Sequence, residues 1–125
     1  MKIGLISTPM ALTALLLLGG TAHAQTQVTV ETWLDDMMGQ LPTFFCQPDQ
    51  YFIQCFDVSQ EECRSVSLEE ARRCADEMAD RFPPLLNMPD DGRQWGSELG
   101  RCAGIGYDRV LAERKSDAAR CNPSG

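Results

Sequence analysis

Six cysteines carry the most distinctive chemistry of this chain, and they have no histidine to act with. The only histidine, His23, lies in a segment that has the features of a secretory signal peptide. No Cys-x-x-Cys pair is present, so the spacing does not favour a zinc site or a redox-active dithiol. An even number of cysteines in an exported chain instead predicts three disulfide bonds. The six residues are Cys46, Cys55, Cys63, Cys74, Cys102 and Cys121.

Carboxylates are the remaining groups that could support catalysis, as the paired acids of glycoside hydrolases do. Most of the acidic doublets fall at expected helix starts or on polar faces, where capping and solvation account for them. Glu98 lies between Trp95 and Leu99 and is the acid to test first. We nevertheless expect no enzymatic activity, no cofactor and no metal. The doublets are Asp35-Asp36, Glu61-Glu62, Glu69-Glu70 and Asp90-Asp91.

The first 24 residues predict export. Lys2 supplies the positive start, an apolar run covers residues 11–18, and Ala22-His23-Ala24 is a small-residue cleavage site. We therefore divide the chain into a signal peptide, residues 1–24, and a single domain, residues 25–125. No cysteine stands at the cleavage point, so we expect no lipid anchor. No second apolar stretch is long enough to span a membrane, and we expect a periplasmic or secreted protein without stable membrane insertion.

The charge of the mature domain narrows the range of partners. Loss of Lys2 leaves ten basic residues against eighteen acidic ones, a net charge of −8. An acidic domain without a basic stripe is poorly suited to nucleic acid. A protein partner is compatible with this charge.

Four segments have helical periodicity, and none shows convincing strand alternation. The first begins at a Thr29 cap and is expected to end at Pro42; the second is short and begins near Pro48. Ser59 and Ser67 each begin a capping-box pattern, and the second is expected to open the helix with the strongest pattern in the chain. Residues 85–90 are expected to be a linker, and the fourth helix to run from Asp91 to about residue 115. The predicted fold is all-α: a small four-helix bundle or orthogonal array with three disulfides.

Helix geometry limits the disulfide pairing. If one helix carries both Cys63 and Cys74, eleven residues separate them by roughly 16 Å, too far for a bridge. We expect Cys55 to pair with Cys63 across a helix–helix corner and Cys102 to pair with Cys121 in a returning tail. Cys46 and Cys74 remain for the third bond.

Glycine recurs every four residues in the fourth helix, at positions 92, 96, 100 and 104. Each interior glycine costs a helix about 0.8–1 kcal/mol relative to alanine, so the stripe requires a reason. The stripe permits close approach, either by another helix of the same domain or by a partner. If a partner binds there, we expect Gly100 and Gly104 to line the contact and Trp95 and Tyr107 to anchor it.

The stretch from Gly100 to Tyr107, GRCAGIGY, resembles the cysteine-centred helix of the Rap1a/Tai type of periplasmic immunity proteins. That resemblance implies a small exported helical protein that blocks a type VI secretion amidase by direct binding. Our leading hypothesis is a non-enzymatic protein-binding module, for example an immunity or inhibitor protein that acts on a secreted toxin or enzyme. The alternatives are an accessory or structural factor of a secretion or envelope system, and a small carboxylate-dependent hydrolase.

Overall fold

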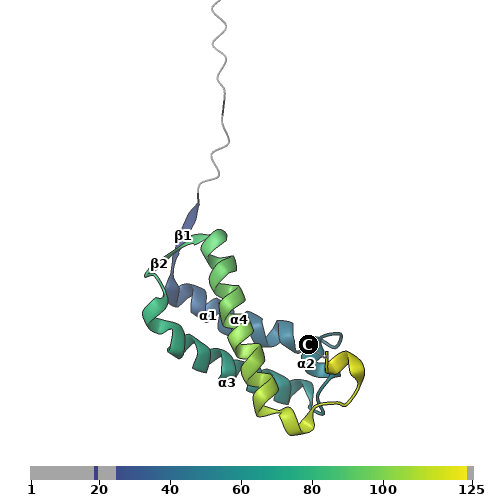
Figure 1. Cartoon of the computed structure of the whole chain (residues 1–125). Helices are drawn as coiled ribbons and strands as arrows, with labels where there is room; N and C mark the ends of the chain where they lie inside the picture. The colour runs from purple at the N-terminus through teal and green to yellow at the C-terminus, as the bar shows by residue number, and fades with distance from the viewer. Residues whose placement is uncertain (1–18, 20–24, 124–125) are drawn as a thin grey trace, which may run out of the picture.

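The computed structural model describes Gly19 and residues 25–123. Apart from Gly19, the predicted signal peptide, including His23, lies outside the described residues. The order of the longer elements is β1 (Thr26–Thr29), α1 (Val30–Phe45), α2 (Tyr51–Gln54), α3 (Gln60–Met78), β2 (Leu85–Met88) and α4 (Asp90–Val110) (Figure 1). Short 3-10 turns at Ala79–Arg81, Ala112–Arg114 and Ala119–Cys121 complete the fold. The prediction of a small helical domain with three disulfides is confirmed.

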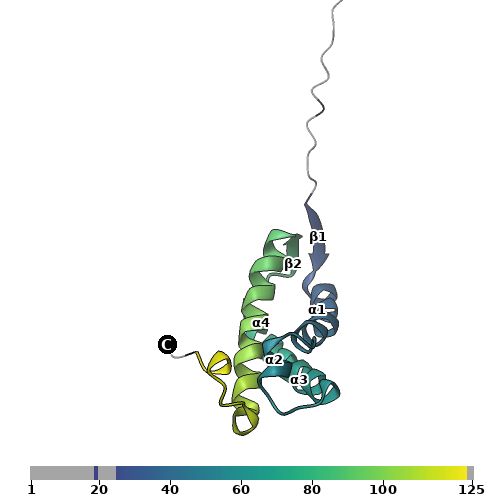
Figure 2. The ribbon, with the colours of Figure 1, turned by 90° about the vertical axis from the view of Figure 1, so that its right-hand side faces the viewer.

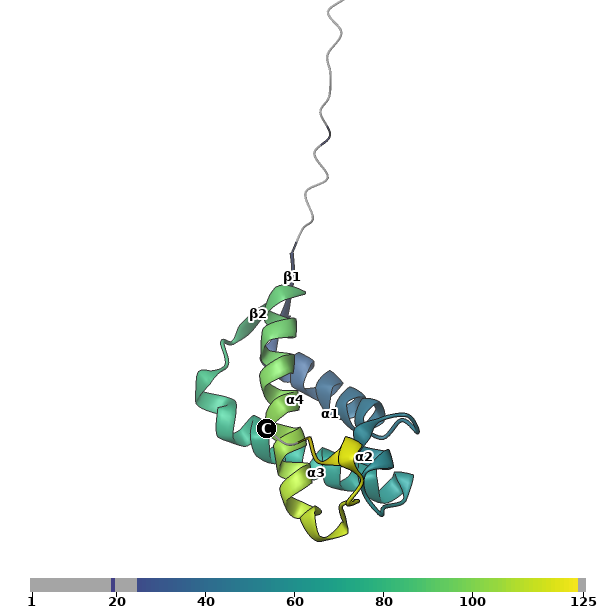
Figure 3. The same ribbon diagram turned by 45° about the vertical axis from the view of Figure 1, so that its right-hand side comes forward.

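α3 is the central element of the core. Its most extensive helix contacts are with α1 and with α4, while α1 and α4 touch each other less. Figure 3 shows α4 crossing α3 and the C-terminal segment lying beside α2. Leu99 and Tyr107 of α4 and Ala71 of α3 are fully buried. Burial of such side chains is the main favourable term in folding.

The start of α3 differs from the expectation. Ser59 is its N-cap, and the Ser59 hydroxyl accepts a hydrogen bond from the Glu62 amide at 3.1 Å. The prediction that the second capping box opens a helix was wrong. Ser67 does not begin a helix but lies buried inside α3. No glycine or proline separates the two patterns, so the first cap starts a helix that nothing interrupts.

The end of α1 was also predicted wrongly. Thr29 caps the helix as expected and accepts a hydrogen bond from the Thr32 amide. Pro42, however, does not end the helix, which continues to Phe45. A proline lacks one amide donor but keeps its carbonyl, and the Pro42 carbonyl accepts from the Cys46 amide at 3.2 Å. The extra turn places the Phe45 ring in the core.

Residues 85–88 form a strand, although the sequence predicted a linker. β2 pairs with β1 in antiparallel register, with Thr26 opposite Met88 and Thr29 opposite Leu85. Figure 2 shows this ribbon at one end of the domain, beside the start of α4. Four residues are too few for a clear alternation pattern, and the partner strand lies about sixty residues earlier in the chain, so only the folded structure brings them together.

The three expected disulfide pairs are all wrong. The observed bonds are Cys46–Cys63, Cys55–Cys121 and Cys74–Cys102. Cys63 and Cys74 are both on α3 and are not bonded to each other, which agrees with the length argument.

Tertiary packing explains each of these pairs. The end of α1 lies against the start of α3, with Cα atoms of Cys46 and Cys63 5.9 Å apart. α3 and α4 cross where they carry Cys74 and Cys102. The tail returns to α2 rather than to α4, held by the Ser116 amide donating to the Cys55 carbonyl at 2.7 Å. Within the part of the chain that the structure describes, no helix is both long and apolar enough to cross a membrane.

Candidate functional site

An exposed column of side chains runs along one side of α4. Arg101, Ile105 and Arg109 are four residues apart, so they follow one side of the helix. All three are exposed, and the Ile105 side chain is 60% exposed although it is apolar. We call these three residues the α4 ridge. They line two hollows, one on each side of the ridge.

The apolar hollow has a volume of about 560 Å³ and is open to solvent. Its wall is aromatic, because the ends of α1 and α2 place their rings beside α4. The Phe45 and Phe52 rings stack with centroids 4.3 Å apart, and Tyr51 meets Phe52 edge-on at 5.2 Å. Such packing fixes the wall before any ligand arrives. Beside the ridge, the hollow is lined by Phe45, Tyr51, Phe52, Gly100, Gly104 and Asp108.

The glycine stripe packs against side chains of the same domain. An added Cβ would lie 3.6 Å from Leu41 at Gly100 and 3.2 Å from Phe52 at Gly104. Both glycines are half-buried and also line the apolar hollow. The stripe therefore lets side chains of α1 and α2 lie over α4. Its last two glycines, Gly100 and Gly104, form part of the wall of the apolar hollow.

Tyr107 was wrongly expected to be an exposed anchor. It is fully buried, and its hydroxyl donates to the Phe52 carbonyl at 2.9 Å. Burial, with the nearby charge of Glu62, raises the pKa of Tyr107 to about 12. The helical periodicity that put Tyr107 beside the glycines also turns it toward α2 and the core.

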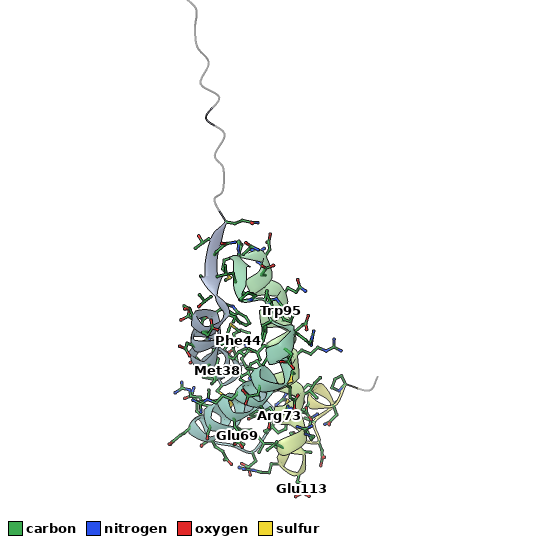
Figure 4. All side chains as sticks on the ribbon, turned by 90° about the vertical axis from the view of Figure 1, so that its left-hand side faces the viewer. Met38, Phe44, Glu69, Arg73, Trp95 and Glu113 are labelled. Carbon is green, nitrogen blue, oxygen red and sulfur yellow. A yellow bond between two sulfur atoms is a disulfide. The ribbon has the colours of Figure 1, made fainter. Side chains whose placement is uncertain are left out.

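Trp95 lies outside both hollows. Figure 4 shows Trp95 on α4 nearer the strand end of the domain, away from Arg73 on α3. Its ring is half-buried and packs edge-on against Phe82 at 5.0 Å, with the Arg81 guanidinium 5.5 Å from its centroid. The structure thus brings Gly100 and Gly104 together at one site and separates Trp95 from it.

The polar hollow, of about 760 Å³, lies between the ridge and α3. Its charges are mostly paired with each other: Arg73 binds Glu77 and Arg81 binds Glu98. Arg73 also donates to the Glu70 carboxylate at 2.8 Å. These hydrogen bonds raise the pKa of Arg73, the bond to Glu70 more than the bond to Glu77.

The two ridge arginines are much less neutralised. No ion pair of Arg101 occurs among residues 25–123. Arg109 reaches Glu70 only at 3.8 Å, and that carboxylate is already bound closely by Arg73. The ridge therefore presents two arginines with free hydrogen-bonding capacity, one on each side of an exposed isoleucine.

A further charged group, the Asp108 carboxylate, lines the apolar hollow. Asp108 accepts hydrogen bonds from the Tyr51 hydroxyl and from Lys115, the latter at 3.1 Å. Burial and the hydrogen bond to Asp108 raise the pKa of Tyr51, whereas the hydrogen bonds with Tyr51 and then Asp108 raise the pKa of Lys115. The charge of Asp108 is thus neutralised locally and does not oppose the ridge.

Glu98 and Glu70 both lie in ion pairs with arginine side chains. Glu98 is part of the surface ion pair with Arg81, with its side chain 38% exposed. The buried acid is Glu70, which is 6% exposed and lies against the α4 backbone at Gly106. Within the described residues, no group of three possible metal ligands occurs. Sequence reasoning named Glu70 only as part of a doublet and missed its burial, because helical periodicity does not reveal which turn a neighbouring helix covers.

Sequence reasoning also missed the ridge. The four-residue spacing of Arg101, Ile105 and Arg109 could have been read from the sequence. Their exposure could not, because it depends on where α1, α2 and α3 leave α4 uncovered.

The fold and the site together define a small, disulfide-stabilised helical protein with an open, apolar hollow and an arginine-flanked ridge. Residues 27–115 match the family described as T2SS substrate NttA. The chain belongs to this family of substrates of the type II secretion system, and it is accordingly an exported protein. No curated protein and no solved structure matches the chain.

Proposed function

We propose that this protein acts after export by binding another protein, and that it is not an enzyme. The main support for this proposal is the apolar hollow beside the α4 ridge, where a 60% exposed isoleucine adjoins a preformed aromatic wall. Apolar surface of this kind, rimmed by charged groups, is typical of an interaction site. Phe44, 55% exposed beside Phe45, extends it along α1.

The state of the acids supports binding over catalysis. A general acid or base needs a free carboxyl group that faces a cleft. Glu98 is ion-paired with Arg81, and Glu70 is held by Arg73 beneath the ridge. Glu98 lines the polar hollow, but its carboxylate is bound to Arg81 and is not free, and Glu70 lines neither hollow.

The resemblance of residues 100–107 to Rap1a/Tai immunity proteins suggests the form that binding takes. Gly100, Gly104 and Ile105 from that stretch line the apolar hollow. Our proposal therefore includes inhibition of an enzyme or toxin as its leading version. An accessory role in a secretion or envelope system would use the same surface and remains the alternative to test.

The test uses photo-crosslinking with the mature protein. A benzophenone amino acid at Ile105 should crosslink a defined protein from the secreted or target-cell fraction. The matched control is the same probe at Val110, which is 54% exposed at the end of α4 but lines neither hollow. An excess of wild-type protein without the probe should compete for the partner and abolish the crosslink. An equal excess of an Ile105→Asp variant should not. Equal crosslinking from both positions would contradict the proposal.

A further inference from the structure

We propose that the α4 ridge binds an acidic polypeptide segment, one that carries an apolar side chain between two carboxylates. This inference rests on the proposed function, because it names the chemistry of the partner at the same site. Arg101 and Arg109 would each pair with a carboxylate, and the apolar side chain would enter the hollow beside Ile105.

Arginines outnumber carboxylates around the two hollows. Four arginines and three carboxylates line the two hollows, whereas the mature domain as a whole has ten basic and eighteen acidic residues. Two further charges lie next to the hollows and balance each other: Glu70 beneath Arg109 and Lys115 on Asp108. The ridge is therefore a positive site on an acidic protein. The lining arginines are Arg73, Arg81, Arg101 and Arg109, and the lining carboxylates are Glu77, Glu98 and Asp108.

Ion pairs within the domain occupy two of these four arginines. Arg73 and Arg81 are occupied by Glu70, Glu77 and Glu98, so they contribute little to a ligand. Arg101 and Arg109 keep their capacity for an external anion. Arginine binds carboxylate through two parallel hydrogen bonds, which makes it selective for that group.

Spacing selects a polypeptide. Eight residues of helix separate Arg101 from Arg109, which is about 12 Å along the axis. Two carboxylates with an apolar group between them match this length when a partner helix carries them at four-residue intervals. A fatty acid has one carboxylate and could satisfy only one arginine. It would also need an enclosed cavity for its chain, whereas the apolar hollow is open.

The probe is a helical host peptide of about 15 residues with the pattern Glu-x-x-x-Leu-x-x-x-Glu. We expect it to bind the mature protein by fluorescence anisotropy at physiological salt, where charges beyond about 8 Å are screened. A peptide with Lys in place of both Glu residues should bind roughly 2- to 30-fold more weakly, as expected for the loss of two exposed ion pairs. A peptide with Ser in place of Leu should also bind more weakly.

Charge exchange is the decisive variant experiment. Arg101→Glu/Arg109→Glu should reverse the preference, so that the Lys peptide binds better than the Glu peptide. Arg93→Glu is the matched control, because Arg93 is a highly exposed arginine of α4 that lines neither hollow. Since all three arginines are exposed, thermal unfolding should confirm that the variants fold. An unchanged preference in the double variant would overturn the proposal.

Other occupants give distinct results. Displacement of the Glu peptide by oleate at lower concentration than by unlabelled peptide would overturn the proposal in favour of a lipid. Self-association of the mature protein that Arg101→Glu abolishes would overturn it in favour of a second copy. A crosslinked partner whose attached segment is basic would overturn the acidic-segment inference and leave the proposed function standing. Equal crosslinking at Ile105 and Val110 would refute the proposed function itself, whatever the peptides do.

Discussion

Gly106 is the glycine whose replacement should harm the fold most, although it lies outside the four-residue stripe. An alanine Cβ there would lie 2.7 Å from the Glu70 carboxyl carbon and 2.8 Å from Arg73 Nη2. Both distances are shorter than real Cβ contacts, so the Glu70 carboxylate would have to leave its position against α4. Gly106→Ala therefore has two opposing effects on the free energy of unfolding: helix propensity is gained, and the ion pair between Glu70 and Arg73 is lost.

The sizes of these two effects decide whether the variant is more or less stable than the wild-type protein. Alanine gains about 0.8–1 kcal/mol over glycine inside a helix. Breaking a fully buried ion pair costs about 3–5 kcal/mol, and about half of that is expected here because the Arg73 side chain is 33% exposed. The variant should thus lose about 0.5–1.7 kcal/mol. For a domain of this size the Tm should fall by roughly 2–14 °C.

Thermal unfolding followed by circular dichroism, without reductant, measures this change. A double-mutant cycle isolates its cause: in a Glu70→Ala background, Gly106→Ala should no longer destabilise, because the carboxylate is gone and the end of the Arg73 side chain, released from Glu70, can move away. If Gly106→Ala instead raised the Tm of the wild-type protein, the close packing of Glu70 against α4 would be refuted.

Gly100→Ala should stabilise the domain by up to about 1 kcal/mol, because the new methyl group would make an ordinary 3.6 Å contact with Leu41; a lower Tm would contradict this. The midpoints of ionisation of both tyrosines should lie above pH 10 in the folded protein, as measured by absorbance at 295 nm; a midpoint at or below pH 10 would contradict this. Because the folded pKa of Tyr107 is raised from 10.0 to about 12, its contribution to stability should be complete below pH 10 and lost as pH rises toward 12; a constant free energy of unfolding across that interval would oppose this. Replacing Cys55 and Cys121 by alanine should cost more than replacing Cys46 and Cys63, by about 1 kcal/mol, since the bonds span 66 and 17 residues. Urea unfolding compares the two variants, and the reverse order would count against the loop-entropy argument.

The sequence by itself determined the helical class, the number of disulfides and several boundaries. Thr29 and Ser59 cap α1 and α3 as their patterns predicted, because capping depends on residues within one turn. The export of the chain is consistent with its family. These features are local, or follow from composition.

Tertiary structure decided the disulfide pairing, the strand pair and the site. Cys46 meets Cys63 and Cys74 meets Cys102 only because α3 packs against α1 on one side and α4 on another. Tyr107 and Ile105 are two residues apart on α4, yet one is fully buried and the other is 60% exposed. Helical periodicity orders residues around an axis, but the neighbours that cover each face come from distant parts of the chain. The contacts of Arg101 and Arg109 could therefore not be derived from their spacing, whereas the caps could.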